Sequence, residues 1–262
     1  MLEGDILYSI ETLPPFSETS RRVVEILGDP DRSLPDIVDV IKYDQSITAN
    51  LLRMCNSAYF GFVRKVTSLE QAVSLMGHQT VLELAMISGS LTYYNQGIPG
   101  YRVEGRGMLR HSISCALLSQ ILGGKKERTG ASILFTAGLL HDIGKVVLSS
   151  LVRDRFVEIL NLVEEENYSF VEAEREVLGM DHAQVGGEVA RKWGLPETIR
   201  NPIAGHHDFE RVRQGDWNTI VIYIFFCSIV EKSNTQRTRP SGAFGSGASG
   251  SLWTGSFVPV VA

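Results

Sequence analysis

Residues that begin α-helices recur along most of this chain, and apolar residues follow each of them at three- and four-residue spacing. Asp44, for example, precedes Ile47 and Leu51. The other predicted N-caps are Ser17, Ser33, Ser68, Ser169 and Asp181. No segment between them alternates apolar and polar residues over the length of a strand. This pattern predicts an all-α fold, a bundle of many helices joined by short turns.

A Gly-rich stretch that carries Pro99, residues 95–107, divides the helical pattern into two halves. It is either a linker between domains or an ordinary surface loop. The length of 262 residues allows one large domain or two small ones. We expect an N-terminal helical subdomain over residues 1–100 and a second helical subdomain over residues 101–232. Residues 233–262 are rich in Gly and Ser, and we expect this tail to be disordered.

Charge and cysteine content narrow the classes of protein. A net charge of −5 argues against a broad basic surface for duplex nucleic acid. The cysteines Cys55, Cys115 and Cys227 form no CxxC pair, so we expect neither disulfides nor thiolate zinc sites. The acidic N-terminus lacks the charge pattern of a signal peptide, and the apolar residues 219–230 are too few to span a bilayer. We therefore expect a cytoplasmic protein that contacts no membrane.

The segment GLLHDIGK at residues 138–145 is the strongest candidate for chemistry, because an apolar run delivers His141 and Asp142 side by side. An adjacent imidazole nitrogen and carboxylate oxygen suit a divalent metal ion. The pair could instead be two polar residues on a buried helix that ends at Gly144. Five of the six histidines lie in this half of the chain. The predicted metal ligands are His111, His141, Asp142, His182, His206 and His207.

These ligands lie on separate helical segments, and a helical bundle can aim such side chains into one pocket. The pocket would hold one metal ion, or two ions bridged by Asp142, and would act on a phosphoester. Lys145 could stabilise phosphate charge, so Asp142 and Lys145 are the catalytic candidates if the site is active. The alternative is that each histidine is a surface residue or a satisfied core residue.

Several segments resemble a known family. They are LPP at residues 13–15, IKYDQSITANLLR at 41–53, NSAY at 56–59 and SLEQAVSLMG at 68–77. Over residues 13–230 the chain resembles HDOD proteins, a branch of the HD-domain superfamily of helical metal-dependent phosphohydrolases. The resemblance implies an HD/HDOD-like bundle and a bacterial regulatory protein of signal transduction. Catalysis is not generally established for HDOD modules, so the resemblance favours a non-catalytic role.

The resemblance also implies roles for particular residues. All six predicted ligands match metal-binding positions of the HD superfamily, and His182, His206 and His207 resemble the additional ligands of its two-metal branch, which cleaves cyclic di-nucleotides. The implied cofactor is one or two divalent ions of iron, manganese or nickel. The superfamily's final aspartate is missing, because the position that we align with it is Phe226. A Phe cannot bind metal, so this difference should weaken the site.

Three interpretations follow. The first is a non-catalytic signalling module that binds an unidentified signalling protein or a small nucleotide. The second is a metal-dependent phosphodiesterase or phosphohydrolase that acts on (cyclic di-)nucleotides. The third is a purely structural scaffold. The resemblance and Phe226 favour the first. An apolar surface on the N-terminal helices would also suit a homodimer.

Overall fold

The computed structural model describes residues 2–27, 29, 31–123 and 128–208, and these form an all-α structure, which confirms the predicted fold class. Within these ranges, β structure is limited to an isolated antiparallel bridge between Ile98 and Val103. The apolar residues 219–230, which include Phe226, and the tail at 233–262 lie outside the described residues.

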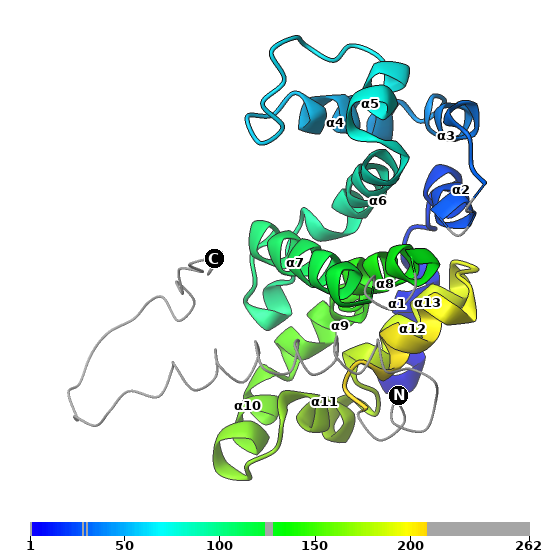
Figure 1. Cartoon of the computed structure of the whole chain (residues 1–262). Coiled ribbons are helices and arrows are strands. Elements are labelled where there is room, and N and C mark those ends of the chain that lie inside the picture. Colours follow the sequence, from blue (N-terminus) through cyan, green and yellow to red (C-terminus); the bar gives the residue numbers. More distant parts are fainter. Residues whose placement is uncertain (1, 28, 30, 124–127, 209–262) are drawn as a thin grey trace, which may run out of the picture.

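The helices of the N-terminal half follow one another closely. They are α1 (Leu2–Thr12), α2 (Glu18–Leu27), α3 (Leu34–Ile41), α4 (Gln45–Cys55), α5 (Leu69–Met76) and α6 (His78–Tyr94). Figure 1 shows α3, α4 and α5 at one end of the molecule, with α6 running from them toward α7 and α8.

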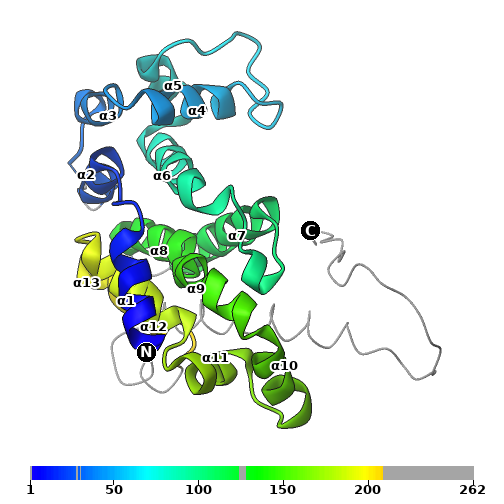
Figure 2. The ribbon, with the colours of Figure 1, turned by 180° about the vertical axis from the view of Figure 1, so that it is seen from behind.

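The C-terminal half begins with a short 3-10 helix. Its elements are η1 (Pro99–Tyr101), α7 (Gly105–Gly123), α8 (Arg128–Leu140), α9 (Ile143–Asp154), α10 (Phe156–Glu165), α11 (Phe170–Leu178), α12 (His182–Lys192) and α13 (Glu197–Gly205). In Figures 1 and 2 both views place α10 and α11 at the end of the molecule opposite to α3, α4 and α5. Helices α7, α8, α9, α12 and α13 lie between the two ends.

Local sequence determines most helix starts. The side chains of Ser33, Asp44, Ser169 and Asp181 each accept a hydrogen bond from a backbone N–H of the first helical turn, as N-caps do. Ser17 accepts one from the N–H of Ser20. These predictions are confirmed because a cap depends only on residues within one turn of it.

The spacing of Ser68 and Gln71 predicts a capping box at the start of α5, and this box forms only in part. Ser68 accepts from the N–H of Gln71, as predicted. The side-chain oxygen of Gln71 accepts from the N–H of Thr67 and not from that of Ser68. The Gln71 side chain therefore accepts a hydrogen bond from the backbone of Thr67, the residue before the N-cap Ser68.

Three helical segments differ from the sequence prediction. The prediction has no helix before Pro14, but α1 lies there and packs against α9 and α12. Its carbonyl end is held by Lys192, whose ammonium donates to the carbonyl oxygens of Ile10 and Glu11. The structure also adds α13, which contains Pro202, a residue that argues against a helix interior. The apolar pattern also predicts a helix from about Val152 to Glu164, whereas α9 runs to Asp154 and α10 begins at Phe156.

Residues 95–107 are not an ordinary surface loop, because Gly100 and Tyr101 are buried. The N–H of Gly100 donates to Ser149 Oγ of α9 at 3.1 Å. A Cβ atom on Gly100 would lie 1.8 Å from the Ser149 carbonyl oxygen, so only glycine allows this close approach. The segment is therefore packed onto α9. The domain division at residue 100 stays a prediction.

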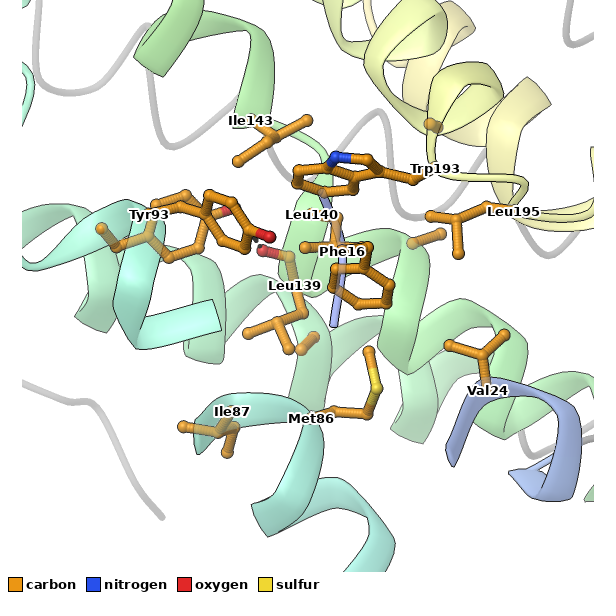
Figure 3. Close-up of a cluster of buried hydrophobic side chains, with 14 of the residues drawn as sticks. Phe16, Val24, Met86, Ile87, Tyr93, Leu139, Leu140, Ile143, Trp193 and Leu195 are labelled. Atoms are coloured by element: carbon orange, nitrogen blue, oxygen red, sulfur yellow. Dashed lines mark hydrogen bonds between the residues drawn. The ribbon is translucent and has the colours of Figure 1, made fainter. Parts of the chain in front are cut away.

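An aromatic cluster joins the two halves of the chain. Phe16 and Trp193 are stacked with their ring centroids 4.9 Å apart, and Tyr93 lies 4.8 Å from Trp193. Figure 3 shows these rings with Leu139 and Leu140 at the end of α8. Both leucines are fully buried, so their packing in the cluster fixes the end of α8. The next two residues, His141 and Asp142, belong to the candidate site.

Helices α8 and α9 supply the most apolar part of the described chain. Residues Ala131–Asp154 are long and apolar enough to cross a membrane by length and composition, but 83% of their most apolar window is buried inside the structure. Such burial is typical of a core helix of a soluble protein. The cytoplasmic location stays a prediction.

Candidate metal centre

The turn between α8 and α9 presents His141 and Asp142 to the interior. Helix α8 ends at Leu140 and α9 begins at Ile143, so the interpretation of one helix that ends at Gly144 is wrong. The side chains of His141 and Asp142 are each 2% exposed. Gly144 lies in the first turn of α9, where an added Cβ would be 1.9 Å from the carbonyl oxygen of His182. This close contact brings the first residue of α12 beside Asp142.

The structure brings all six predicted ligands into one pocket. His111 comes from α7, His182 begins α12, and the pair His206 and His207 directly follows α13. The Asp142 carboxylate lies between two groups of imidazoles. Its two oxygens therefore face different groups, and a bridge between two ions stays a prediction.

The first group faces Asp142 Oδ2. The Nε2 atoms of His111 and His141 are 3.2 Å apart. Asp142 Oδ2 lies 3.5 Å from Nε2 of His111 and 3.3 Å from Nε2 of His141. Atoms that share one metal ion are separated by such distances when each metal–ligand bond is about 2.0–2.2 Å.

The second group faces Asp142 Oδ1. His182 Nε2 lies 3.4 Å from this oxygen, and His206 Nε2 lies 3.7 Å from it. The Nε2 atoms of His182 and His207 are 2.9 Å apart. The possible ligand atoms of His182, His206 and His207 all lie within 4.8 Å of one another.

Hydrogen bonds on the far side of three rings orient them toward the pocket. Nδ1 of His141 lies 2.8 Å from the carbonyl oxygen of Gly138, and Nδ1 of His206 lies 2.7 Å from that of Ile203. A carbonyl oxygen only accepts hydrogen bonds, so each Nδ1 carries the proton and each Nε2 keeps its lone pair. This is the arrangement of metal-binding histidines.

The third oriented ring depends on two residues that the sequence analysis missed. Glu174 of α11 is fully buried, and its Oε2 accepts from Nδ1 of His182 at 2.7 Å and from the His182 backbone N–H at 3.0 Å. Its Oε1 accepts from the Tyr101 hydroxyl at 2.5 Å. Burial raises the pKa of Tyr101 well above its ordinary value, and the Glu174 carboxylate raises it further. The hydroxyl therefore stays a donor.

Comparison with known proteins gives the family. The HDOD domain matches residues 13–209, most of the chain. The chain belongs to the HDOD family. An HDOD protein of unknown function from Geobacter sulfurreducens has the same fold, with a TM-score of 0.71 and 24% identity over 95% of this chain and 84% of that one. A putative signal transduction protein from Marinobacter aquaeolei also has this fold, with a TM-score of 0.69 and 22% sequence identity over 94% of this chain and 58% of that one.

One relative of this HDOD chain in sequence is a ribonuclease. Ribonuclease Y of Aquifex aeolicus is 28% identical over 148 residues, which are 55% of this chain and 21% of that protein. This chain spans less than half the length of the first curated relatives that it matches.

The charge states of the HDOD pocket suit a metal ion. Burial alone would raise the pKa of the Asp142 carboxyl, but the Lys145 ammonium and other neighbouring groups lower it, and the balance lies well below the ordinary value. Burial lowers the pKa of both His206 and His207, and the neighbouring histidines lower it further. An ionised carboxylate beside neutral imidazoles is the form in which these side chains bind metals.

Two atoms of the pocket have no hydrogen-bond partner. Asp142 Oδ1 and His206 Nε2 are both buried and unsatisfied. The Nε2 atoms of His182 and His206 lie near Oδ1, but they cannot donate to it, because the proton of each ring is on Nδ1. An unsatisfied buried polar group costs about 1–3 kcal/mol. A divalent ion would satisfy both atoms, so the residues present fit a metal.

The pocket has a more open side. Lys145 donates from Nζ to Asp142 Oδ2 at 2.9 Å, and its side chain is 13% exposed. His111 is 24% exposed. The other ligands of the first group are almost fully buried, so a soluble ligand would approach past these two side chains.

Proposed function

We propose that this chain is a regulatory HDOD module that holds one or two divalent ions among its six ligands and binds a phosphate-bearing small molecule beside them. The orientation of the rings carries this proposal, since His141, His182 and His206 all direct an unprotonated Nε2 toward the Asp142 carboxylate. Iron, manganese and nickel are the ions that we favour.

The residues around the pocket suit a phosphate ligand. A bound ion would act as a Lewis acid toward phosphate oxygens. Lys145 holds a cation at the open side of the pocket, within reach of the same oxygens. Asp142 keeps the ammonium in place through an ion pair of 2.9 Å. A small nucleotide is therefore the ligand class that we propose.

We further propose that the module regulates without catalysing a reaction. This role is supported by Phe226, which we align with the superfamily's last carboxylate ligand. Losing one oxygen ligand leaves enough donors to hold an ion but changes its coordination. We propose that ligand binding is passed on to a signalling protein partner or to a second copy of the chain. Duplex nucleic acid and membranes are not among the proposed partners.

Elemental analysis tests the proposed metal site. The full chain is expressed with iron, manganese and nickel supplied, and we expect about one or two ions per chain for a site of this kind. Asp142→Asn removes the charge that both ligand groups share and should lower the content to about a tenth or less. The control is His78→Gln, since His78 begins α6 and is not part of the pocket. A wild-type chain without metal, or equal metal in Asp142→Asn, contradicts the proposal.

A metal-dependent phosphodiesterase is the second candidate. The placement of Asp142 between two ligand groups favours it, because two ions can stabilise both the attacking and the leaving oxygen of a phosphodiester. The likeness to a ribonuclease adds RNA to the cyclic di-nucleotides as substrate classes. Turnover of either substrate that disappears in a His141→Ala, Asp142→Ala variant would support this candidate over the regulatory one. Equal turnover in the double variant would assign the activity to a contaminant.

A further inference from the structure

Cys115 is a side chain at the metal centre that neither the sequence analysis nor the proposed function uses. It lies on α7 one helical turn after His111, so the two side chains share a helix face. It is 4% exposed, and its Sγ lies 3.7 Å from His111 Nε2. The thiol therefore borders the first ligand group.

Close packing of two helices sets this position. Gly138 of α8 faces α7, where an added Cβ would lie 2.9 Å from the Cα atom of Ala116 and 3.0 Å from the Cys115 carbonyl oxygen. Only glycine allows the two backbones to approach so closely. The approach places Cys115 beside the end of α8, which delivers His141 and Asp142.

Four separations among these ligand atoms match those of a tetrahedral site. His111 Nε2, His141 Nε2 and Cys115 Sγ all lie within 4.8 Å of one another. Metal–ligand bonds of about 2.0–2.2 Å to nitrogen or oxygen and about 2.3 Å to sulfur, at tetrahedral angles, separate the ligand atoms by about 3.3–3.6 Å. The observed separations are 3.2 Å between the imidazoles, 3.7 Å from His111 to the sulfur, and 3.3 and 3.5 Å from the imidazoles to Asp142 Oδ2.

We propose that the Cys115 thiolate is the fourth protein ligand of the ion held by His111, His141 and Asp142. This inference rests on the proposed function, which places a metal in the pocket. On binding, the thiol releases its proton to solvent as the sulfur–metal bond forms. The unsatisfied oxygen of Asp142 is Oδ1, which faces the second ligand group. The ion proposed here therefore rests on the grouping of the His111, His141 and Cys115 ligand atoms.

The thiolate makes the two halves of the centre chemically different. The first group combines two imidazoles, a carboxylate oxygen and a soft sulfur, a donor set that favours zinc, cobalt or ferrous iron. The second group offers His182, His206, His207 and the other oxygen of Asp142, and has no sulfur among its members. The two sites would therefore select different ions, and the expectation that this chain has no thiolate metal site would be wrong.

Cobalt(II) absorption spectroscopy of the full chain tests this ligand. Metal-free protein is titrated with cobalt(II), and we expect a thiolate-to-cobalt charge-transfer band in the near ultraviolet together with visible bands of tetrahedral cobalt. Cys115→Ser should abolish the ultraviolet band while cobalt still binds at the second group. The matched controls Cys55→Ser and Cys227→Ser should keep the band, which assigns it to one of the three cysteines.

The outcomes separate this inference from the proposed function. Wild-type protein that binds cobalt without the ultraviolet band overturns the thiolate ligand and leaves the proposed metal site standing. A band that persists in Cys115→Ser also overturns it. Protein that binds no cobalt, and no other divalent ion, overturns both. Where Cys115→Ser folds poorly, a band that is present in wild type and kept in both Cys55→Ser and Cys227→Ser still assigns the ligand to Cys115.

Discussion

Glu174 gives the most direct test of how the pocket is held in shape. This fully buried carboxylate receives two hydrogen bonds from His182 and one from Tyr101. Glu174→Gln keeps the size and shape of the side chain but removes its charge. The amide oxygen can still accept from His182, and the Tyr101 hydroxyl can turn to accept from the amide nitrogen. The variant should therefore fold with every partner still paired.

The size of the effect follows from the type of hydrogen bond. A bond to a charged group contributes about 1.5–3 kcal/mol and a neutral one about 0.5–1.5 kcal/mol, so each bond loses about 1 kcal/mol. Two of the three bonds orient His182. The expected loss in metal binding is about 2 kcal/mol, which is roughly a 30-fold rise in Kd. Changes behind metal-binding histidines cost about 10–100-fold in affinity, and the value lies in that range.

A competition titration against a metal-binding dye measures this Kd. Glu172→Gln is the matched control, because Glu172 lies on the same helix but is exposed. Glutamine can also complete the capping box that Glu172 forms with Ser169, so the helix start should be kept. Equal affinities in wild type and Glu174→Gln, with the folds intact, would show that Glu174 does not position a metal ligand.

Two further substitutions test the geometry of the site. Gly144→Ala places a Cβ 1.9 Å from the carbonyl oxygen of His182, a backbone atom that cannot turn aside, and should lower the free energy of unfolding by about 3 kcal/mol or more in urea. Gly4→Ala, which meets nothing within 4 Å, is the control and should cause no loss, and equal stability of both variants would contradict the close contact of α9 and α12. Lys145→Gln removes the cation 2.9 Å from Asp142 Oδ2 and should raise metal affinity by about tenfold while weakening phosphate binding. Calorimetric titration with metal and then with inorganic phosphate checks both, and unchanged phosphate affinity would remove Lys145 from the proposed ligand site.

The sequence predicted those parts of the molecule that depend on neighbouring residues. The N-caps at Ser33, Asp44 and Asp181 match the structure because each depends on local patterns. Helix α1 was missed because its place depends on contacts with Lys192 and other residues that are distant in sequence.

In the candidate site, too, some residues could be predicted from the sequence and others could not. The six predicted ligands could be named because adjacent His and Asp residues and repeated histidines are visible in the chain. Their metal binding stays a prediction. Glu174 left a signal that was not used: it is spaced three residues after Val171 and four before Leu178, on the apolar face of its helix, where a charged residue needs a buried partner. Tyr101 left none, since its neighbours are Gly and Pro residues that read as a loop.

The directions of four helices have a consequence for the charge that the pocket can hold. Helices α8 and α13 end at the pocket, whereas α9 and α12 begin there. Each helix end carries a partial charge of about half an electron, negative where a helix ends and positive where one begins. These macrodipoles largely cancel, which leaves the ionised side chains to set the local field. Asp142 and Glu174 against Lys145 leave one net negative charge, and the proposed Cys115 thiolate makes it two. One divalent cation would therefore neutralise the centre, and a second would make it positive and attract an anion. Cation and anion would thus bind with positive cooperativity, and the apparent affinity for inorganic phosphate would rise with metal occupancy.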